Sequence, residues 1–400
     1  MSKKVNKKVP RLRFPEFKDN WEQVTIEEIA SVSSGGTPSR SEPSFWNGDI
    51  PWVTTSEIGQ AEIYESVEKI TKKGLENSSA KLFKKDTILL AMYGQGKTRG
   101  QVSILKIEAT TNQACAAITL KSNCNSEFLY YVLFKEYEQL RLLSNDGSQK
   151  NLSAGLIKQY IVPKTSKEEQ EKIASFLGSI DSQLTQLRRK HELLQTYKRG
   201  VMQKIFSQEL RFKDATGSDF PDWEEKKLGE LFKWVRTNSL SRESLSLETG
   251  SIQNIHYGDI HKKFKSQFKL SNEEVPYIIN EILASNIDVE DFCRIGDLVI
   301  ADASEDYADI GKAIEIIEVE PNKLVAGLHC FIARPKEKLI IGYSGYSFQS
   351  ENVRKQIKKI AQGISVLGIS KTNLGYTIFP YPKPEEQQKI ANFQIGRAHV

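Results

Sequence analysis

KEEQEKIASF (Lys167–Phe176) returns later in the chain as PEEQQKIANF (Pro384–Phe393), and this near-identity decides the fold. The segments just before them also match, because SAGLIKQYIVP (Ser153–Pro163) parallels SKTNLGYTIFP (Ser370–Pro380). Self-similarity at a long spacing indicates repeated structural units and has to be recognised before single elements are assigned. The chain is therefore read as two related halves.

The beginnings of the two halves match as well. Leu12-Arg13-Phe14 corresponds to Leu210-Arg211-Phe212, and Trp21-Glu22 corresponds to Trp223-Glu224. Between these shared edges the halves differ almost completely. Matching ends around unrelated interiors predict one scaffold that carries two different recognition domains.

The variable parts have mixed periodicity. KKDTILLAMYG and RIGDLVIADAS are apolar runs led by a charged turn, which predicts buried strands. SEFLYYVLFKEYEQLRLL (Ser126–Leu143) is amphipathic with Ser126 as its N-cap, and Tyr346–Gln362 holds the equivalent place in the second half. We expect each domain to be α+β and about 150 residues long.

A long helix is predicted between the two domains. Ser166 and Glu169 fit a capping box at its start. At 1.5 Å per residue, some 42 residues would form a rod of roughly 60 Å. Apolar residues recur on a heptad spacing, the pattern of a coiled-coil seam that needs a partner helix. The predicted interface residues are Ile173, Leu177, Ile180, Leu184, Leu187, Leu194, Val201 and Ile205.

Composition limits the classes of protein. The chain has 400 residues, a net charge of +5 and 39% hydrophobic residues, which fits a globular protein that is mildly basic. Its four cysteines form no CxxC pair, so we expect free thiols in a reducing compartment. No apolar stretch of about 20 residues and no signal peptide is present, which predicts a cytoplasmic protein without a membrane partner.

AMYGQGKTRGQ (Ala91–Gln101) resembles a phosphate-binding loop, but Ala91 stands where the P-loop requires its first glycine. Other catalytic signals are also weak. The chain contains no Pro-Pro motif of amino-methyltransferases, and the carboxylates of PDWEEK (Pro221–Lys226) are too close together for a PD…ExK nuclease. His256 and His261 have no third ligand at metal spacing, so no metal site is expected. A stand-alone nuclease or ATPase, and a protein–protein adaptor without a DNA role, are the alternative functions.

Several strings in a fixed order resemble a known family. They are GGTPSRSEPSFWNGDIPWVTTSEI (Gly35–Ile58), NIHYGDIHKKF (Asn254–Phe264), DLVIADAS (Asp297–Ser304), AGLHCFIARP (Ala326–Pro335) and the junction LSAGLIKQYIVPKTSKEEQEKIASFL. Together they resemble the DNA-specificity subunit of type I restriction–modification systems over almost the whole chain.

The resemblance implies two target-recognition domains, each of which reads one half of a split double-stranded DNA site. It also implies two long helices that pair antiparallel and fix the gap between the half-sites. Two modification (methyltransferase) subunits would bind this scaffold, and restriction (translocase/nuclease) subunits could join them. S-adenosylmethionine, ATP and Mg would belong to those partners, and this chain would be a non-catalytic subunit that binds no cofactor.

Residues suited to DNA gather in glycine-containing or polar-aromatic stretches of each half. Glycine lets the backbone approach closely, Lys binds phosphate, and Arg can also bind guanine O6 and N7. The candidate DNA-binding residues are Gly36, Thr37, Arg40, Lys97, Thr98, Arg99, Gln101, Asn254, His256, Tyr257, His261, Lys262 and Lys263.

These features predict a division of the chain into six parts. They are a basic flexible tail (1–10), target-recognition domain 1 (11–163), the central spacer helix (164–208), target-recognition domain 2 (209–380), the start of a C-terminal spacer helix (381–393) and a non-native tail (394–400). The second repeat breaks off at QIGRAHV, and the coding sequence of its last six residues, IGRAHV, can match a common sequencing adapter. We therefore expect a truncated second spacer helix, with natural truncation as the alternative to an adapter artefact.

Overall fold

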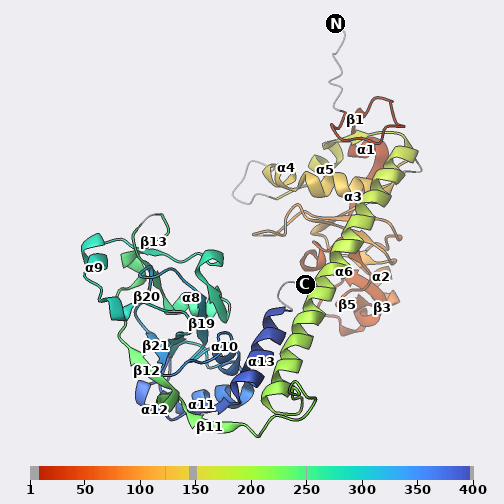
Figure 1. Cartoon of the computed structure of the whole chain (residues 1–400). Coiled ribbons are helices and arrows are strands. Elements are labelled where there is room, and N and C mark those ends of the chain that lie inside the picture. Colours follow the sequence, from red (N-terminus) through yellow and green to blue (C-terminus); the bar gives the residue numbers. More distant parts are fainter. Residues whose placement is uncertain (1–8, 95, 122, 144–150, 249, 397–400) are drawn as a thin grey trace. The chain divides into compact units, whose positions relative to one another are not determined.

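The computed structural model describes residues 9–94, 96–121, 123–143, 151–248 and 250–396. The chain divides into two compact units, residues 1–190 (unit 1) and 191–400 (unit 2), and each is described separately. The boundary falls within one continuous helix, α6 (Lys167–Phe206), drawn in yellow-green in Figure 1.

Unit 1 is built on two small sheets. The larger has the order β2 (Ala30–Ser34), β9 (Cys115–Leu120), β6 (Ile88–Ala91), β7 (Val102–Leu105) and β4 (Glu62–Ile63). The smaller has the order β5 (Glu68–Ile70), β3 (Trp46–Val53) and β8 (Thr110–Thr111). A separate pair, β1 (Glu22–Thr25) and β10 (Ile161–Lys164), joins the two ends of the unit's variable part. The helices are α1 (Ile26–Ile29), α2 (Lys72–Glu76), α3 (Ser126–Lys135), α4 (Tyr137–Leu142) and α5 (Ala154–Gln159).

Unit 2 repeats this plan. Its larger sheet has the order β12 (Phe232–Val235), β21 (Cys330–Pro335), β17 (Leu298–Ala301), β19 (Ala313–Glu318) and β15 (Gln267–Lys269). Its second sheet has the order β13 (Leu245–Ser246), β16 (Tyr277–Ile278), β14 (Gln253–Ile255) and β20 (Leu324–Ala326). Two strand pairs complete it, β11 (Glu224–Lys227) with β23 (Ile378–Tyr381) and β18 (Ala303–Ser304) with β22 (Leu367–Gly368). The helices are α7 (Leu228–Leu231), α8 (Tyr257–Lys262), α9 (Glu281–Ser285), α10 (Tyr343–Ser347), α11 (Glu351–Ile360), α12 (Lys371–Gly375) and α13 (Pro384–Gly396).

The two larger sheets correspond strand by strand, including the direction of pairing. The edge strand β4 pairs parallel with β7, and β15 pairs parallel with β19, while the other neighbours in both sheets are antiparallel. In the second sheets, β3 pairs parallel with β8, and β14 with β20. Two nearly unrelated sequences therefore adopt one α+β fold, and the predicted fold class with its internal repeat is confirmed.

The central strands explain why their sequences are apolar throughout. Side chains alternate between the two faces of a strand, so a strand that is covered on both faces needs apolar residues at every position. Ile88 and Leu90 of β6 join one core cluster, whereas Leu89 and Ala91 join another. Strand β17 divides its four residues, Leu298 to Ala301, between two clusters in the same alternating way.

The predicted helices form, with corrections at their boundaries. The N-cap of α3 is Asn125, whose side chain accepts from the Phe128 amide, and not Ser126. The helix predicted to run to Leu143 breaks at Glu136, between α3 and α4. The helix predicted over 346–362 is likewise divided into α10 and α11, because Ser350 caps α11 in an extended conformation.

The predicted capping box at the start of α6 is half made. The Glu169 amide donates to the Ser166 hydroxyl at 3.3 Å. The Glu169 carboxylate instead accepts from Arg13 at 2.6 and 2.7 Å and from the Trp21 indole at 3.2 Å. A buried carboxylate gains more from a guanidinium and an indole N–H than from a single backbone amide. The side chain is therefore used to hold the N-terminal segment.

The same clamp occurs in unit 2. Glu386, in the first turn of α13, accepts from Arg211 at 3.2 and 2.9 Å and from the Trp223 indole at 2.9 Å. Phe14 packs edge-on against Phe176 in unit 1, and Phe212 packs in the same way against Phe393 in unit 2. These contacts explain the Arg-Phe, Trp and Glu matches at the edges of the repeat.

Candidate nucleic-acid interface

One end of the sheets in each unit carries the loops that hold the candidate DNA-binding residues. We call this the loop edge: in unit 1 it follows β2, β3, β6 and β8, and in unit 2 it follows β12, β14, β17 and β20. The loops here differ in sequence between the two units. Their backbones are nevertheless tied together by the same hydrogen bonds in both units.

Four backbone hydrogen bonds define this common frame. In unit 1 the amides of Gly36, Met92, Asn112 and Leu152 donate to the carbonyls of Thr111, Ala114, Val53 and Met92, at 2.8, 2.9, 3.1 and 3.0 Å. In unit 2 the amides of Asn238, Asp302, Gly327 and Ile369 donate to the carbonyls of Ala326, His329, Ile255 and Asp302, at 3.1, 3.0, 2.9 and 2.9 Å. The frame therefore assigns each loop of one unit to its counterpart in the other.

The loop after β2 is fixed by close backbone packing. A Cβ atom on Gly36 would overlap Ser79, so only glycine fits this approach. The Thr37 hydroxyl bonds to Gln113 in the neighbouring loop. The Arg40 guanidinium lies 3.7 Å from the centre of the Trp46 ring and donates two hydrogen bonds to Glu68. Arg40 therefore already has a carboxylate partner, unlike a free phosphate-binding arginine.

The β6–β7 loop presents its lysine to solvent. Gly94, Gly96 and Gly100 have φ of 131°, 71° and 86°, so the backbone turns through conformations that favour glycine. Lys97 is exposed, and its carbonyl accepts from the Tyr137 hydroxyl at 2.6 Å. The chain then enters strand β7, whereas a nucleotide P-loop leads into a helix.

The other three candidates of this loop are half-buried. The Arg99 guanidinium donates to the Arg141 carbonyl at 3.2 Å, which anchors the loop on α4. Thr98 and Gln101 lie partly exposed on either side of it. Lys97 thus has the more exposed charge of this loop, whereas Arg99 anchors the loop to α4.

In unit 2 the candidates form a cluster around Tyr257. The Tyr257 ring centre lies 4.6 Å from that of His256 and 6.0 Å from that of His261. His256 caps α8 by accepting from the Gly258 amide at 3.1 Å, and burial, followed by the charge of Arg242, lowers the pKa of His256. A neutral His256 is consistent with this acceptor role. Lys262 and Lys263 are exposed at the end of α8.

Asn254 does not share this accessibility. Its side chain is fully buried and accepts from the Asn238 amide group at 2.7 Å, and a Cβ atom on Gly327 would overlap it. Asn254 therefore holds three loops of the unit 2 frame together and is not available to a ligand.

Two further residues, His329 and Asp302, lie beside this cluster without having been predicted from the sequence. His329, in the β20–β21 loop, lies 5.3 Å from Tyr257 between ring centres, and its Nδ1 is 3.1 Å from a carboxylate oxygen of Asp302. Both residues stand inside strings that carried the family resemblance, DLVIADAS and AGLHCFIARP. Aligning the two halves by their buried strands, rather than by their matching edges, would have drawn attention to them.

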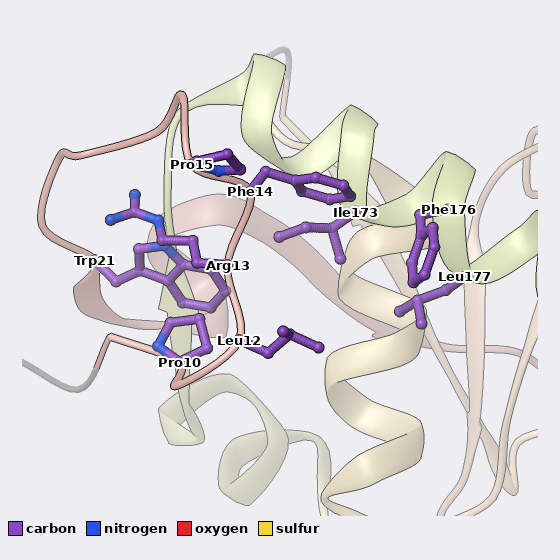
Figure 2. Close-up of a pocket in the computed structure, with 9 residues that line it drawn as sticks. All are labelled: Pro10, Leu12, Arg13, Phe14, Pro15, Trp21, Ile173, Phe176 and Leu177. Atoms are coloured by element: carbon purple, nitrogen blue, oxygen red, sulfur yellow. The ribbon is translucent and has the colours of Figure 1, made fainter.

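The heptad residues of α6 have three different environments. Ile173 and Leu177 line an apolar hollow of about 380 Å³ with Phe14 and Trp21, as Figure 2 shows. Val201 and Ile205 are buried in the core of unit 2. The residues between them are exposed on the helix surface, and these are Ile180, Leu184, Leu187 and Leu194. The middle of α6 therefore carries an uncovered apolar stripe within the described part of the chain.

The second spacer helix and the tail remain expectations. The described helix α13 ends at Gly396, and of the expected non-native tail only residues 394–396 fall within it. Residues 397–400, like the predicted basic tail up to residue 8, lie outside the described residues. Over the ranges that the structure describes, no His, Cys, Asp and Glu side chains group as metal ligands, and no helix combines the length and apolar character needed to cross a bilayer.

Comparison with known proteins identifies the family. The type I restriction modification DNA specificity domain matches residues 18–195 and again residues 221–394. The MjaIX specificity subunit of Methanocaldococcus jannaschii is 30% identical over 247 residues, which cover 58% of this chain and 56% of the relative. The EcoR124I/EcoR124II specificity subunit of Escherichia coli is 26% identical over 43% of each chain. The chain thus spans about half the length of these two relatives, whereas the MjaVIII subunit of M. jannaschii aligns over 96% of this chain and 87% of its own length at 24% identity.

Solved structures share the fold. The S subunit of a type I restriction–modification system from M. genitalium has a TM-score of 0.54 at 16% identity and covers 98% of this chain and 92% of its own. A chain from a structural study of type I complex assembly and conformational transition has a TM-score of 0.59 at 16% identity, with the same coverage. With two matched specificity domains on one repeated α+β scaffold, the chain belongs to the type I restriction–modification DNA-specificity family.

Proposed function

We propose that this chain is the DNA-specificity subunit of a type I restriction–modification complex and that each unit reads one half of a bipartite target. The observation that carries the proposal is the pair of loop edges, which share one backbone frame but present different side chains. A constant frame keeps both edges in the same geometry, while the side chains determine which bases are accepted. The spacer helices would set the gap between the half-sites.

The candidate residues divide by expected role. Exposed lysines would contact phosphates and contribute affinity that depends on salt, and these are Lys97, Lys262 and Lys263. Polar and aromatic side chains would contact base edges, and these are Thr98, Gln101, His256 and Tyr257. Thr37 and His261 would instead brace their loops, because the Thr37 hydroxyl bonds to Gln113 and the His261 Nε2 lies 2.9 Å from the Ala303 carbonyl oxygen. Gly36, Arg40, Arg99 and Asn254 would shape the loops, since their side chains or backbones are engaged within the chain.

The exposed stripe in the middle of α6 supports a docking role for the spacer. Large apolar side chains in a row on a helix surface are typical of a surface that another protein covers. We propose that modification subunits dock on the spacer and that restriction subunits join the assembly. The chemistry, with S-adenosylmethionine, ATP and Mg, would belong to those partners, and the complex would act on chromosomal DNA in the cytoplasm.

The first experiment measures DNA binding by the chain assembled with its modification subunits, over a range of salt concentrations. Specific binding should weaken steeply as salt rises, and Lys97→Gln should reduce the slope of log K against log salt by about 0.9. Lys85→Gln is the matched control, because Lys85 is exposed in the turn before β6, at the opposite end of that strand. Equal slopes for the two variants would mean that Lys97 of the β6–β7 loop does not contact a DNA phosphate.

The same preparation separates the alternative functions. A stand-alone nuclease or ATPase would cleave DNA or hydrolyse ATP as the purified chain, and an adaptor would give no specific DNA binding even with its partners. The proposed function predicts neither turnover by the chain alone nor methyl transfer without modification subunits.

A further inference from the structure

The shared frame places one pair of residues at the same point of both loop edges. Met92 and Ala114 are joined by a backbone hydrogen bond of 2.9 Å in unit 1, and Asp302 and His329 are joined by the corresponding bond of 3.0 Å in unit 2. In each unit the first residue of the pair also accepts from the segment that closes the domain, Leu152 or Ile369. The backbone is conserved in geometry, while apolar side chains in one unit are replaced by ionisable ones in the other.

The His329 side chain is held in place from two sides. Its Nδ1 lies 3.1 Å from Asp302 Oδ1, and its ring lies edge-on to Tyr257 at 5.3 Å. The His329 side chain is 47% exposed and that of Asp302 20% exposed, so the carboxylate lies beneath a ring that faces solvent. The backbone of His329 has φ of 57°, a left-handed conformation that is uncommon for a residue with a Cβ.

The Asp302 carboxylate determines which ring nitrogen of His329 remains as a hydrogen-bond acceptor. A carboxylate can only accept, so in the neutral ring Nδ1 carries the proton and Nε2 is the acceptor. Nε2 has no hydrogen-bond partner among the described residues. In the major groove, the groups that donate to such an acceptor are the amino groups of adenine (N6) and cytosine (N4).

We propose that His329 is a specificity-determining residue of unit 2, which accepts a hydrogen bond at Nε2 from a base amino group in the major groove. Asp302 is its positioning residue, because it fixes the ring and its tautomer without touching the base. Met92 and Ala114 offer no such acceptor, so unit 1 lacks this contact at the equivalent point. The inference rests on the proposed function and names one contact within it.

A hydrolytic role for the Asp302–His329 pair has less support. Such a pair needs a hydroxyl or thiol nucleophile beside the imidazole. The nearby Ser304 hydroxyl donates to the Asp306 carbonyl and accepts from the Asp306 amide, so it is engaged in its own turn. Cys330 is fully buried beneath the loop.

The test uses a matched pair of glycine variants in the full chain, assembled with its modification subunits. His329→Gly removes the imidazole while glycine tolerates the left-handed backbone. Asn322→Gly is the control, because Asn322 is also exposed with φ of 56° but precedes β20, whereas His329 follows it. The preferred half-sites of both variants and of the unmodified chain are selected from random sequence, and their affinities are then measured.

His329→Gly should weaken binding about five- to tenfold at one base pair of the half-site of unit 2, as expected for one lost hydrogen bond. The other half-site and the Asn322→Gly variant should be unchanged. Asp302→Asn should relax the same base pair to a smaller extent, without changing binding to unrelated DNA. If the parent binds its target specifically and His329→Gly keeps the same base preference, the inference about His329 is wrong, while the proposed function stands. Absence of specific binding in the parent overturns the proposed function instead.

An amino-deleted base then tests the direction of the hydrogen bond. Replacing the adenine or cytosine of that base pair with an analogue that lacks the exocyclic amino group should weaken the parent about as much as His329→Gly does. The same replacement should have no further effect on His329→Gly. Additive losses would mean that the amino group and His329 act independently, which would contradict the assignment.

Discussion

The duplicated clamp gives a prediction whose magnitude follows from its contacts. In unit 2 the Glu386 side chain is 1% exposed and is the shared acceptor for Arg211 and the Trp223 indole. Glu386→Gln keeps the shape of the side chain but removes its charge and replaces one acceptor oxygen with a donor. Hydrogen bonds to charged groups contribute about 1.5–3 kcal/mol each, and Arg211 is 17% exposed and partly screened, so we take the lower end. The variant should lower the free energy of unfolding of unit 2 by about 2 kcal/mol.

Chemical denaturation provides the assay, with Trp223 fluorescence as a probe inside the clamp and circular dichroism as a probe of the whole chain. Glu385→Gln is the control, since Glu385 is the neighbouring carboxylate of the same helical turn and is exposed. Its effect should stay within about 0.5 kcal/mol, as for other surface substitutions. The double variant Arg211→Gln with Glu386→Gln should be less destabilised than the sum of the single variants. Equal stability of the Glu385 and Glu386 variants would refute the reasoning that the clamp holds the repeat's edge in place.

Three further predictions concern the spacer, a buried acid and a loop. Leu187 and Leu194 are 61% and 51% exposed on α6, so the chain alone should self-associate, and Leu187→Gln with Leu194→Gln should reduce the sedimentation coefficient toward that of a monomer. Burial raises the pKa of Glu315 to about 7 despite hydrogen bonds from two backbone amides. Because the folded chain then holds this proton more tightly than the unfolded chain, the free energy of unfolding should decrease as pH rises from about 4.5 to 7. Glu315→Gln should abolish that slope, as pH-dependent denaturation would reveal. Gly36→Ala places a methyl group against Ser79, so it should weaken recognition of one half-site only, as half-site selection would show.

The scaffold can be predicted well from the sequence because the positions that match in both halves are those that make the same structural contacts. Arg13 and Trp21 recur as Arg211 and Trp223 because each pair must meet a carboxylate at the start of a helix. The strands around Leu89 and Val299 were predictable for a similar reason, since burial on both faces leaves continuous apolar runs.

The loop edges were predicted less well, because their residues meet through contacts that are distant in sequence. Asn254 stood among polar and aromatic neighbours that suggested an exposed cluster, yet the Asn238 amide and the backbone of Gly327 bury it. His329 carried no local signal, since its partners Asp302 and Tyr257 come from other loops. Side-chain roles in such loops depend on the frame, which becomes visible only when the strands are placed.

The most direct test of the central claim is the exchange of one recognition unit for the other. The frame makes residues 31–152 and residues 233–369 equivalent, because Leu152 and Ile369 close the two units through the same backbone hydrogen bond. A chain in which residues 31–152 are replaced by a second copy of residues 233–369 is assembled with modification subunits, and its methylated sites are mapped by sequencing genomic DNA. The methylated target should consist of two copies of the half-site that unit 2 reads, with the original gap. An unchanged half-site of unit 1, or a change in the gap, would contradict the claim that each unit reads its own half on a common scaffold.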